Sequence, residues 1–236
     1  MSNTTEINPH LGATEVNPHL NGAGQPTAIN AEILSPVQIP AGTLLLGNRH
    51  IRALARRIVN GRPITPELVA WAKQHIEWTL AEGSVENPDG VLLLIVDENG
   101  AAAMTVGPYE PLARTDEAAL ISRALGSLRE QDETDVAPET LFAFIDGELM
   151  AGTASDAVRG GAASLVLQLA QTLGIPTTFQ PDLAGMLSDG ALEADEVFLA
   201  SDEHGVVPAS DRAGAQSERF YASYQRLFEK ARKMRR

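Results

Sequence analysis

The sequence predicts an α/β (α+β) fold in two domains, because apolar runs of strand length alternate along the chain with amphipathic segments of helical period. Two of the apolar runs are followed by a second run across a short polar turn, which is the pattern of a β-hairpin. We divide the 236 residues into an N-terminal arm (residues 1–43), a small α+β domain (44–112) and a larger α/β domain (113–236).

The N-terminal arm contains a tandem repeat, TEINPHLGA followed by TEVNPHLNG, and then a run rich in Gly, Pro and Asn. A segment of this composition buries little apolar surface, so we expect it to be flexible. The repeat places His10 and His19 after Asn-Pro, but two histidines without a cluster of carboxylates or thiolates make a poor metal site. We therefore predict no metal, and a docking arm for a partner protein is the alternative use of the repeat.

The small domain is predicted to contain two helices and a hairpin. Residues 49–59 carry apolar side chains at helical spacing. The second helix has start and stop signals, since Thr65 can cap it, Pro66 suits the first turn and Gly83 follows the last turn. The run GVLLLIVDENGAAAMTVG (residues 90–107) predicts a strand, a turn and a second strand.

The larger domain is predicted to mix helices and strands. A helix is expected over residues 113–135, followed by a hairpin over residues 139–152 that turns at Asp146-Gly147. A loop with paired glycines then leads into a helix over about residues 162–173, and residues 194–209 supply two short strands. A final amphipathic helix has an apolar face made of Phe220, Tyr224, Leu227, Phe228 and Ala231.

Composition and charge exclude several classes of function. The net charge of −13 argues against nucleic-acid and anionic-membrane binding, because phosphates would be repelled. The absence of cysteine excludes disulfides and thiolate chemistry. Without a signal-peptide h-region or a membrane-length apolar run, we expect a cytoplasmic protein with no membrane partner. The excess of arginine over lysine, with abundant alanine, indicates a bacterial source of high GC content.

Four stretches of the chain share one resemblance. They are RHIRAL (49–54), TDVAPETLFAFIDGELMAGT (134–153), VRGGAASLVLQLAQTLGIP (158–176) and ADEVFLASDEHGVVPA (194–209). In this order they resemble the class IV aminotransferases, the fold type IV enzymes that include branched-chain aminotransferase, D-amino-acid aminotransferase and aminodeoxychorismate lyase. The last stretch is similar to that family's Ala-Asp-Glu-Val-Phe-Leu-Thr-Gly-Thr-Ala-x-Gly-Val-x-Pro-Val motif. The resemblance is good over residues 134–209 and weak over residues 44–112.

The resemblance implies a shortened two-domain fold that holds pyridoxal phosphate (PLP) between its domains, in a homodimer. The family's lysine, which forms an imine with the cofactor, is expected a few tens of residues before Thr134. The lysines of this sequence are Lys73, Lys230 and Lys233. Arg114 stands near the vacated position, and its guanidinium cannot form the imine because it stays protonated. We therefore expect no lysine-bound PLP and no other cofactor, with PLP present only if the family's chemistry survives.

The resemblance also identifies residues of the expected ligand site. Asp135 matches the glutamate that keeps the pyridine nitrogen of the cofactor protonated. The helix start that cradles the phosphate survives as Gly160, Gly161 and Ala162, which remain an adequate anion site. Arg159 precedes them and is expected to bind a substrate carboxylate, the alternative being an exposed loop arginine.

The turn between the last two predicted strands is the candidate catalytic segment. Ser201, Asp202 and Glu203 stand where the family has Thr-Gly-Thr, and two carboxylates there would repel a bound phosphate unless they point away. His204 follows them. We expect Asp202, Glu203 and His204 to perform acid–base chemistry at neutral pH, with a carboxylate orienting the imidazole. The alternative is a solvated polar turn.

Two further titratable residues lie in the second predicted helix. Lys73 falls off the apolar side of that helix and is expected to be solvated rather than catalytic. His75 lies near the apolar side and is expected to be a partly buried histidine with a satisfied partner rather than a general base.

The sequence therefore predicts a divergent class IV aminotransferase-like protein, or pseudo-aminotransferase. We expect its pocket to be reused for a PLP-independent biosynthetic reaction on a small anionic metabolite. Two alternatives stay open. One is a non-catalytic binding or partner subunit that docks through the N-terminal repeat. The other is a genuine PLP-dependent aminotransferase or lyase that holds its cofactor non-covalently.

Overall fold

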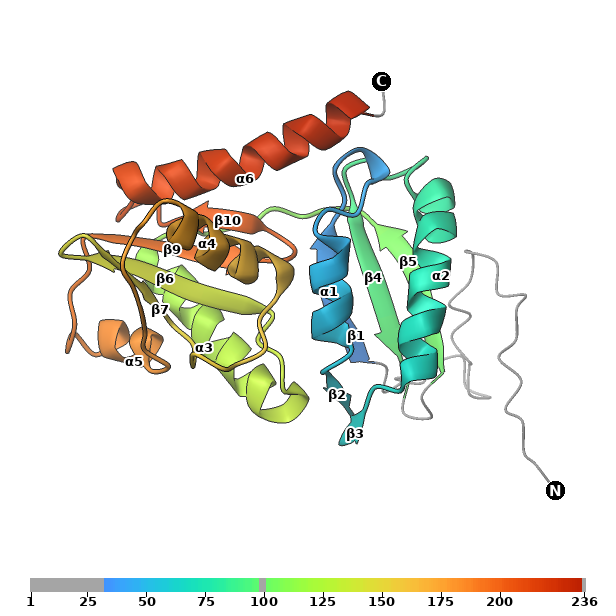
Figure 1. The fold of residues 1–236 in the computed structure, drawn as a ribbon, viewed down its shortest axis with the longest axis horizontal. Coiled ribbons are helices and arrows are strands. Elements are labelled where there is room, and N and C mark those ends of the chain that lie inside the picture. The colour runs from blue at the N-terminus through green and yellow to red at the C-terminus, as the bar shows by residue number, and fades with distance from the viewer. Residues whose placement is uncertain (1–31, 98–100, 235–236) are drawn as a thin grey trace, which may run out of the picture.

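The computed structural model describes residues 32–97 and 101–234, which fold around two separate main sheets and a two-stranded ribbon (Figure 1). The smaller unit contains an antiparallel sheet of three strands in the order β1-β4-β5. The larger unit contains a sheet of five strands in the order β10-β9-β6-β7-β8, which is antiparallel except for the parallel pair β7-β8. The mixed architecture agrees with the predicted fold class.

The smaller unit comprises the elements that precede residue 108. They are β1 (Glu32–Gln38), η1 (Pro40–Gly42), α1 (Gly47–Leu54), β2 (Ile58–Val59), β3 (Arg62–Pro63), α2 (Pro66–Gly83), β4 (Val91–Val96) and β5 (Ala102–Gly107). The second predicted helix is confirmed as α2, because the Thr65 side chain accepts a hydrogen bond from the Leu68 N–H at 3.2 Å. The predicted hairpin is confirmed as β4-β5, although residues 98–100 of its turn lie outside the described residues.

Two predictions for the smaller unit are wrong in their boundaries. Residues 32–38, assigned by sequence to the flexible arm, form β1 and pair with β4. The tandem repeat itself lies outside the described residues. The helix predicted over residues 49–59 ends at Leu54, because Asn60 and Gly61 form a left-handed turn (φ 50° and 71°) that pairs β2 with β3. This Asn-Gly dipeptide is itself the sequence signal for a tight hairpin, and it outweighs the helical spacing of the apolar residues before it.

The larger unit comprises the elements that follow residue 116. They are α3 (Glu117–Thr134), β6 (Glu139–Ile145), β7 (Glu148–Ala151), α4 (Gly161–Thr172), β8 (Thr177–Phe179), α5 (Leu183–Ser188), β9 (Glu196–Ser201), β10 (Gly205–Pro208) and α6 (Ala215–Met234). The hairpin that turns at Asp146-Gly147 is confirmed as β6-β7. Strand β8 and helix α5 were not predicted, because each is too short to show a hydrophobic period.

The five-stranded sheet has a hydrophobic core on each face, since successive side chains of β6 point to opposite sides. Phe142 and Phe144 pack in one core, which α4 and α6 cover. Leu141 and Ala143 pack in the other core, which α3 and α5 cover. The predicted apolar face of the last helix is confirmed, because Phe220, Tyr224, Phe228 and Ala231 are buried and Leu227 is half-buried.

Polar contacts join the two units. The backbone N–H of Gln38 in β1 donates to the backbone carbonyl of Asp202 at 3.1 Å. The buried Arg57 of the smaller unit pairs with Glu130 of α3. Helix α6 also reaches across to contact η1 (Figure 1). The junction is therefore built from backbone and side-chain contacts of several elements, and the segment from Pro108 to Asp116 runs between the units.

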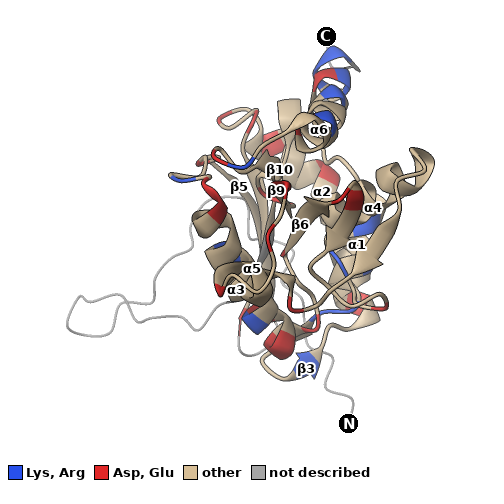
Figure 2. Cartoon of the chain, turned by 90° about the vertical axis from the view of Figure 1, so that its left-hand side faces the viewer, with Lys and Arg blue, Asp and Glu red and all other residues tan. Residues whose placement is uncertain are grey.

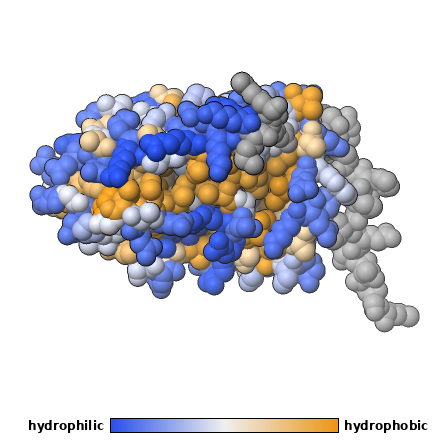
Figure 3. Space-filling model, turned by 45° about the horizontal axis from the view of Figure 1, so that its top comes forward, coloured by the Kyte–Doolittle hydropathy of each residue, from blue (hydrophilic) through white to orange (hydrophobic). Residues whose placement is uncertain are grey.

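The surface combines scattered charge with an apolar band. Basic residues gather toward the C-terminal end of α6, including Arg232 and Lys233 in its last turn, where they complement the helix dipole (Figure 2). Figure 3 shows an apolar band along the middle of the face that comes into view when the top of the molecule in Figure 1 is turned forward. Partly buried side chains adjoin the core beneath α4 and α6; they include Leu45, Leu46, Leu165, Leu167 and Leu169. No helix in the described ranges combines the length and the apolar character needed to span a membrane.

Phe198 lies at the centre of an aromatic cluster beneath α6. Its ring is fully buried and stacks on Phe142 with 5.2 Å between ring centroids, and on Phe220 with 5.5 Å. Phe144 contacts the same ring at 6.3 Å. The cluster joins β6 and β9 of the sheet to α6, so it fixes the position of the last helix.

We predict that Phe198→Ala lowers the free energy of unfolding by about 3–5 kcal/mol, because it leaves a cavity among the other three rings. Phe179→Ala is the matched control, since that ring is 40% exposed, and it should change the free energy by only about 0.5 kcal/mol. Urea denaturation followed by circular dichroism measures both variants. Equal losses in the two variants would contradict a core centred on Phe198.

Candidate functional site

A cavity of about 80 Å³ lies between the two units. Most of its wall is apolar and comes from the smaller unit, and the larger unit contributes Val136, Pro138, Gly160 and Asp202. The ionisable residues in its lining are His50, Arg57 and Asp202. The volume is well below the roughly 300–1,000 Å³ of pockets for drug-sized ligands. The cavity therefore suits only a small molecule in this arrangement of the units.

The Asp202 carboxylate occupies the N-terminus of α4. Its Oδ2 accepts the Gly161 N–H at 3.0 Å and its Oδ1 accepts the Ala162 N–H at 2.7 Å. The N-cap residue Gly160 has no side chain that could cap the helix. A residue distant in sequence therefore satisfies two of the N–H groups that a helix start leaves open, at its positive end.

His50 of α1 binds the same carboxylate. Its Nδ1 lies 3.0 Å from the Asp202 Oδ2, and the two side chains are only 11% and 6% exposed. Because an ionised carboxylate only accepts hydrogen bonds, Nδ1 is the donor, and in the neutral tautomer the lone pair stays on Nε2. Burial acts to raise the pKa of Asp202, but His50 and the N–H groups of Ala162 and Gly161 outweigh it and hold that pKa below its ordinary value.

The paired glycines allow this close approach. A Cβ on Gly161 would lie 2.5 Å from the His50 Cε1, and a Cβ on Gly160 would lie 2.8 Å from the Asp202 Oδ2. Any side chain at these two positions would push the imidazole or the carboxylate away from the helix. The Gly161 and Ala162 N–H groups thus bind an anion that the chain itself supplies, and the predicted binding of a ligand anion by Gly160, Gly161 and Ala162 stays a prediction.

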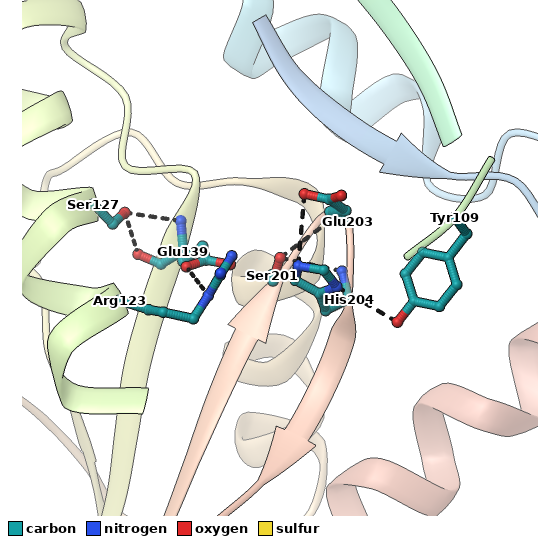
Figure 4. A network of polar contacts seen from close by, with 7 residues as sticks. All are labelled: Tyr109, Arg123, Ser127, Glu139, Ser201, Glu203 and His204. Carbon is teal, nitrogen blue, oxygen red and sulfur yellow. Dashed lines mark hydrogen bonds and ion pairs between the residues drawn. The ribbon is translucent and has the colours of Figure 1, made fainter. Parts of the chain in front are cut away.

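The predicted catalytic group of Asp202, Glu203 and His204 is not assembled. Asp202 bonds to His50 rather than to His204. The His204 Nδ1 lies 3.4 Å from the Tyr109 hydroxyl, and its Nε2 lies 3.6 Å from Glu203, which is beyond hydrogen-bond distance (Figure 4). Neither Glu203 nor His204 lines the cavity. Asp202 and His204 therefore have different partners, His50 and Tyr109, so the predicted acid–base residues do not act on one another.

His204 and Glu203, in the turn between β9 and β10, lie beside Tyr109 of the segment that runs between the two units. Burial lowers the pKa of His204 to about 4, and the positive charge of Arg123 adds to the effect, so the imidazole is neutral at pH 7. Burial also raises the pKa of Glu203 and of Tyr109. Ser201, a predicted ligand residue, instead accepts the backbone N–H groups of Glu203 and His204 at 3.2 Å each (Figure 4).

Glu139 and its partners are polar residues of this region that the sequence did not indicate. The carboxylate of the buried Glu139 accepts hydrogen bonds from the Arg123 Nε, at 2.9 and 3.2 Å, and from its Nη2, at 2.6 Å (Figure 4). Ser127 donates to the Glu139 carbonyl at 2.8 Å and accepts its N–H at 2.9 Å. These bonds attach α3 to the start of β6. A glutamate before an apolar strand carries no sequence signal for such an attachment.

The other predicted ligand residues lie away from the cavity. Asp135 is exposed and ends α3 in a left-handed conformation (φ 64°). Arg114 is exposed and bonds to Asp116 at 2.9 Å. Arg159 donates to the carbonyls of Ala154 and Ser155 and stacks over Phe179, in an open surface depression. Local partners bind the side chains of Arg114 and Arg159, none of the three residues lines the inter-unit cavity, and their predicted ligand roles stay predictions.

The lysines and the remaining histidine have the environments expected from sequence. Lys73, Lys230 and Lys233 are exposed on α2 and α6, and none of them lines the cavity. His75 is half-buried, and its Nδ1 lies 2.8 Å from the Trp71 carbonyl. Among the described residues, no group of three or more His, Cys, Asp or Glu side chains is placed to hold a metal ion.

Comparison with known proteins gives a clear result for the fold. No protein-family model matches the chain, and no curated protein sequence matches it. A fold IV transaminase from Curtobacterium pusillum superposes with a TM-score of 0.53 at 14% identity, over 88% of this chain and 86% of that one. A putative 4-amino-4-deoxychorismate lyase from Legionella pneumophila gives 0.50 at 10% identity, over 86% and 91%. A T.th. branched-chain amino acid aminotransferase with pyridoxamine 5'-phosphate gives 0.50 at 13% identity, over 84% and 85%.

The chain has the fold of the fold type IV aminotransferases. Within this fold type IV scaffold, the residues present do not fit a phosphate-anchored, lysine-bound PLP at the inter-unit cavity. A phosphate at the start of α4 would have to displace Asp202 from the Gly161 and Ala162 N–H groups. In addition, no lysine lines the cavity, and its 80 Å³ is small for a pyridine ring with a phosphate.

We predict that the fold type IV scaffold of this chain loses stability below neutral pH through His204. Its pKa in the folded protein, about 4, lies below its ordinary value of 6.5, so the folded state binds fewer protons between these values. The stabilising effect is complete above pH 6.5 and is lost as the pH falls toward 4, by at most about 3–4 kcal/mol.

Urea denaturation of the wild type and of His204→Gln across pH 4–7 measures this effect. The variant should show a shallower fall in unfolding free energy than the wild type. Identical slopes in wild type and His204→Gln would mean that His204 does not resist protonation in the folded state.

Proposed function

We propose that this chain is a small-molecule enzyme that uses the fold type IV scaffold without lysine-bound PLP. Its reaction centre is the inter-unit cavity, and His50 is its acid–base residue. The observation that carries the proposal is the 3.0 Å hydrogen bond from the His50 Nδ1 to the buried Asp202 carboxylate, in the lining of a mostly apolar cavity. An imidazole held by a carboxylate on one nitrogen is oriented to exchange a proton at the other.

The chemistry of the pair follows from its surroundings. A substrate proton transferred to the His50 Nε2 produces an imidazolium, which the Asp202 carboxylate stabilises through Nδ1. The N–H groups of Gly161 and Ala162 keep that carboxylate ionised and fixed in place. His50, the Asp202 carboxylate and the two N–H groups therefore act together, and His50 is the only one of them that contacts the substrate.

The substrate class follows from the lining of the cavity. We propose a small metabolite with an apolar body and one acidic group, since most of the lining is apolar and its cation, Arg57, could pair with that group as well as with Glu130. The volume of about 80 Å³ limits the body to a few non-hydrogen atoms. The sequence predicts only a small anionic metabolite, and the lining and volume of the cavity add an apolar body and a limit on its size.

The small volume also supports a second function, a non-catalytic binding or partner subunit. In that case the His50–Asp202 pair only joins the units, and no metabolite turns over.

We also propose a homodimer, for which the apolar band on the face seen in Figure 3 is the candidate contact surface. Light scattering coupled to size-exclusion chromatography measures the mass, and a monomer at micromolar concentration would exclude the dimer.

The cofactor prediction is that freshly purified protein is colourless and that borohydride leaves its intact mass unchanged. The reason is that Lys73, Lys230 and Lys233 are all exposed and the α4 N-terminus is satisfied by Asp202. Native mass spectrometry, followed by mass measurement after reduction, tests this. A yellow protein that gains the mass of reduced pyridoxal phosphate would establish a genuine PLP enzyme and overturn the proposal.

The reaction prediction concerns two histidines. Native mass spectrometry after incubation with mixtures of small carboxylic acids should show a bound acid in the wild type and in His204→Ala, but not in His50→Ala. For an acid that turns over, His50→Ala should lower the rate by about 10²–10⁴-fold. Equal binding and turnover in wild type and His50→Ala would remove His50 from the reaction. Binding without turnover in the wild type would favour the non-catalytic subunit.

A further inference from the structure

We propose that two rows of side chains, one on α2 and one on α6, bind to each other between two copies of this chain. The row on α2 is aromatic with a glutamate at each end, and the row on α6 is cationic. Neither row lines the cavity between the units, so this inference does not depend on the proposed reaction. It adds a charged contact to the proposed homodimer, in addition to the apolar band, and it names the surfaces that form that contact.

The α2 row lies along one side of the helix, away from its buried residues Ala72 and Leu80. Its members are three or four positions apart and therefore share one helix face; they are Glu67, Trp71, His75, Trp78 and Glu82. The His75 ring stacks on Trp71 with 4.5 Å between ring centroids and lies 5.7 Å from Trp78 in an edge-on arrangement. The three rings form one continuous aromatic surface, on which Trp78 is 69% exposed.

The charge of the α2 row favours a cationic partner. Glu67 and Glu82 are exposed, and neither side chain has a hydrogen bond or an ion pair with another described residue. The face of a tryptophan ring attracts a cation electrostatically, and the cation is most often an arginine. Tryptophan is also among the residues that contribute most to binding in protein interfaces. Two tryptophans between two unpaired carboxylates therefore suit a row of Arg and Lys side chains.

The α6 row supplies such a set of cations. Its members are exposed and lie seven, four and three positions apart, again on one helix face; they are Arg219, Arg226, Lys230 and Lys233. None of these side chains has an ion pair among the described residues. The buried face of α6, with Phe220, Phe228 and Ala231, lies on another side of the helix. Figure 2 shows the basic residues that gather at the C-terminal end of α6, which projects from the body of the molecule.

The two rows have nearly the same length. Glu67 and Glu82 are about 22 Å apart along α2, and Arg219 and Lys233 are about 21 Å apart along α6, at about 1.5 Å per residue. When the helices lie side by side, the cations at the ends of the α6 row can reach the two glutamates. The two inner cations then lie over the tryptophan rings. The charges and the lengths of the rows are therefore complementary.

Within one copy the two rows do not meet. Trp78 is 69% exposed, and the end of α6 instead contacts η1 and pairs with Asp89 through Arg232, at 3.1 Å. Residues 1–31 contain no Lys or Arg, so that segment has no such side chain to complement the α2 row. A second copy carries both rows, and in a dimer with two-fold symmetry the contact between α2 and α6 forms twice. The charges therefore favour a second copy as the partner.

The experiment reverses the charge of one row at a time in the full-length protein, with the mass measured by light scattering after size-exclusion chromatography. One variant is Glu67→Lys/Glu82→Lys and the other is Arg226→Glu/Lys230→Glu. The wild type should dimerise at low salt and more weakly in about 1 M salt, where the Debye length is about 3 Å. Each variant alone should raise the dissociation constant by roughly 100-fold, because like charges then face each other. An equimolar mixture should restore the dimer, since a mixed pair joins opposite charges at both contacts.

Tryptophan emission locates the contact. Trp71 and Trp78 are the two tryptophans of the chain, so its intrinsic tryptophan fluorescence reports on the α2 row. The emission maximum should move to shorter wavelength as the wild type assembles, and it should stay fixed in either variant alone. Glu77→Lys/Glu133→Lys is the matched control, because it makes the same change in net charge as the α2 variant at exposed positions outside both rows. This control should assemble like the wild type.

A monomeric wild type, no recovery of the dimer in the mixture, or an equal loss in the control would overturn the proposal. A dimer that both reversed variants keep would overturn it too, but would leave the homodimer to the apolar band. If a reversed variant does not fold, dilution of the wild type decides: a change in mass with an emission shift that high salt abolishes supports the contact, and a change in mass without that shift overturns it. None of these results tests turnover, so the proposed reaction is left to its own experiments.

Discussion

The hydrogen bonds that compensate the burial of one carboxylate, that of Asp202, determine how the two units of this protein meet. Asp202 carries a charge into a place that is nearly closed to water, which is unfavourable unless hydrogen bonds replace the lost hydration. The N–H groups at the start of α4 and the imidazole of His50 provide those bonds. Because these partners belong to different units, satisfying the charge also fixes α1 against α4. The glycines at positions 160 and 161 are required by the same contact, since a side chain there would collide with it.

This arrangement gives the fold type IV scaffold an unusual inter-unit site. A helix N-terminus is a natural place for a phosphate, but here its N–H groups already have an anionic partner. The exposed lysines and the small cavity agree with that observation. These observations are the basis of the proposal that the chain does not use lysine-bound PLP. The His50–Asp202 pair then has the composition of an oriented acid–base group, and this is the basis of the proposed reaction.

The β9–β10 turn shows how adjacent residues take different roles. Asp202 bonds to α1 and α4, whereas His204 lies against Tyr109 of the segment between the units. Burial keeps His204 neutral, so it contributes to stability at neutral pH rather than to a reaction in the cavity. The turn therefore holds both the candidate reaction centre and a structural contact within three residues.

The sequence by itself determined the fold class and most elements, because each depends on local patterns: the cap at Thr65, the hairpins at 90–107 and at Asp146-Gly147, and the apolar face of the last helix. It also indicated the solvated position of Lys73. Only the tertiary structure decided that Asp202 binds the start of α4 and that His50, not His204, is its partner. The reason is that a side chain's direction and its long-range partners depend on how helices and sheets pack, and no local pattern of residues encodes a contact across more than a hundred positions.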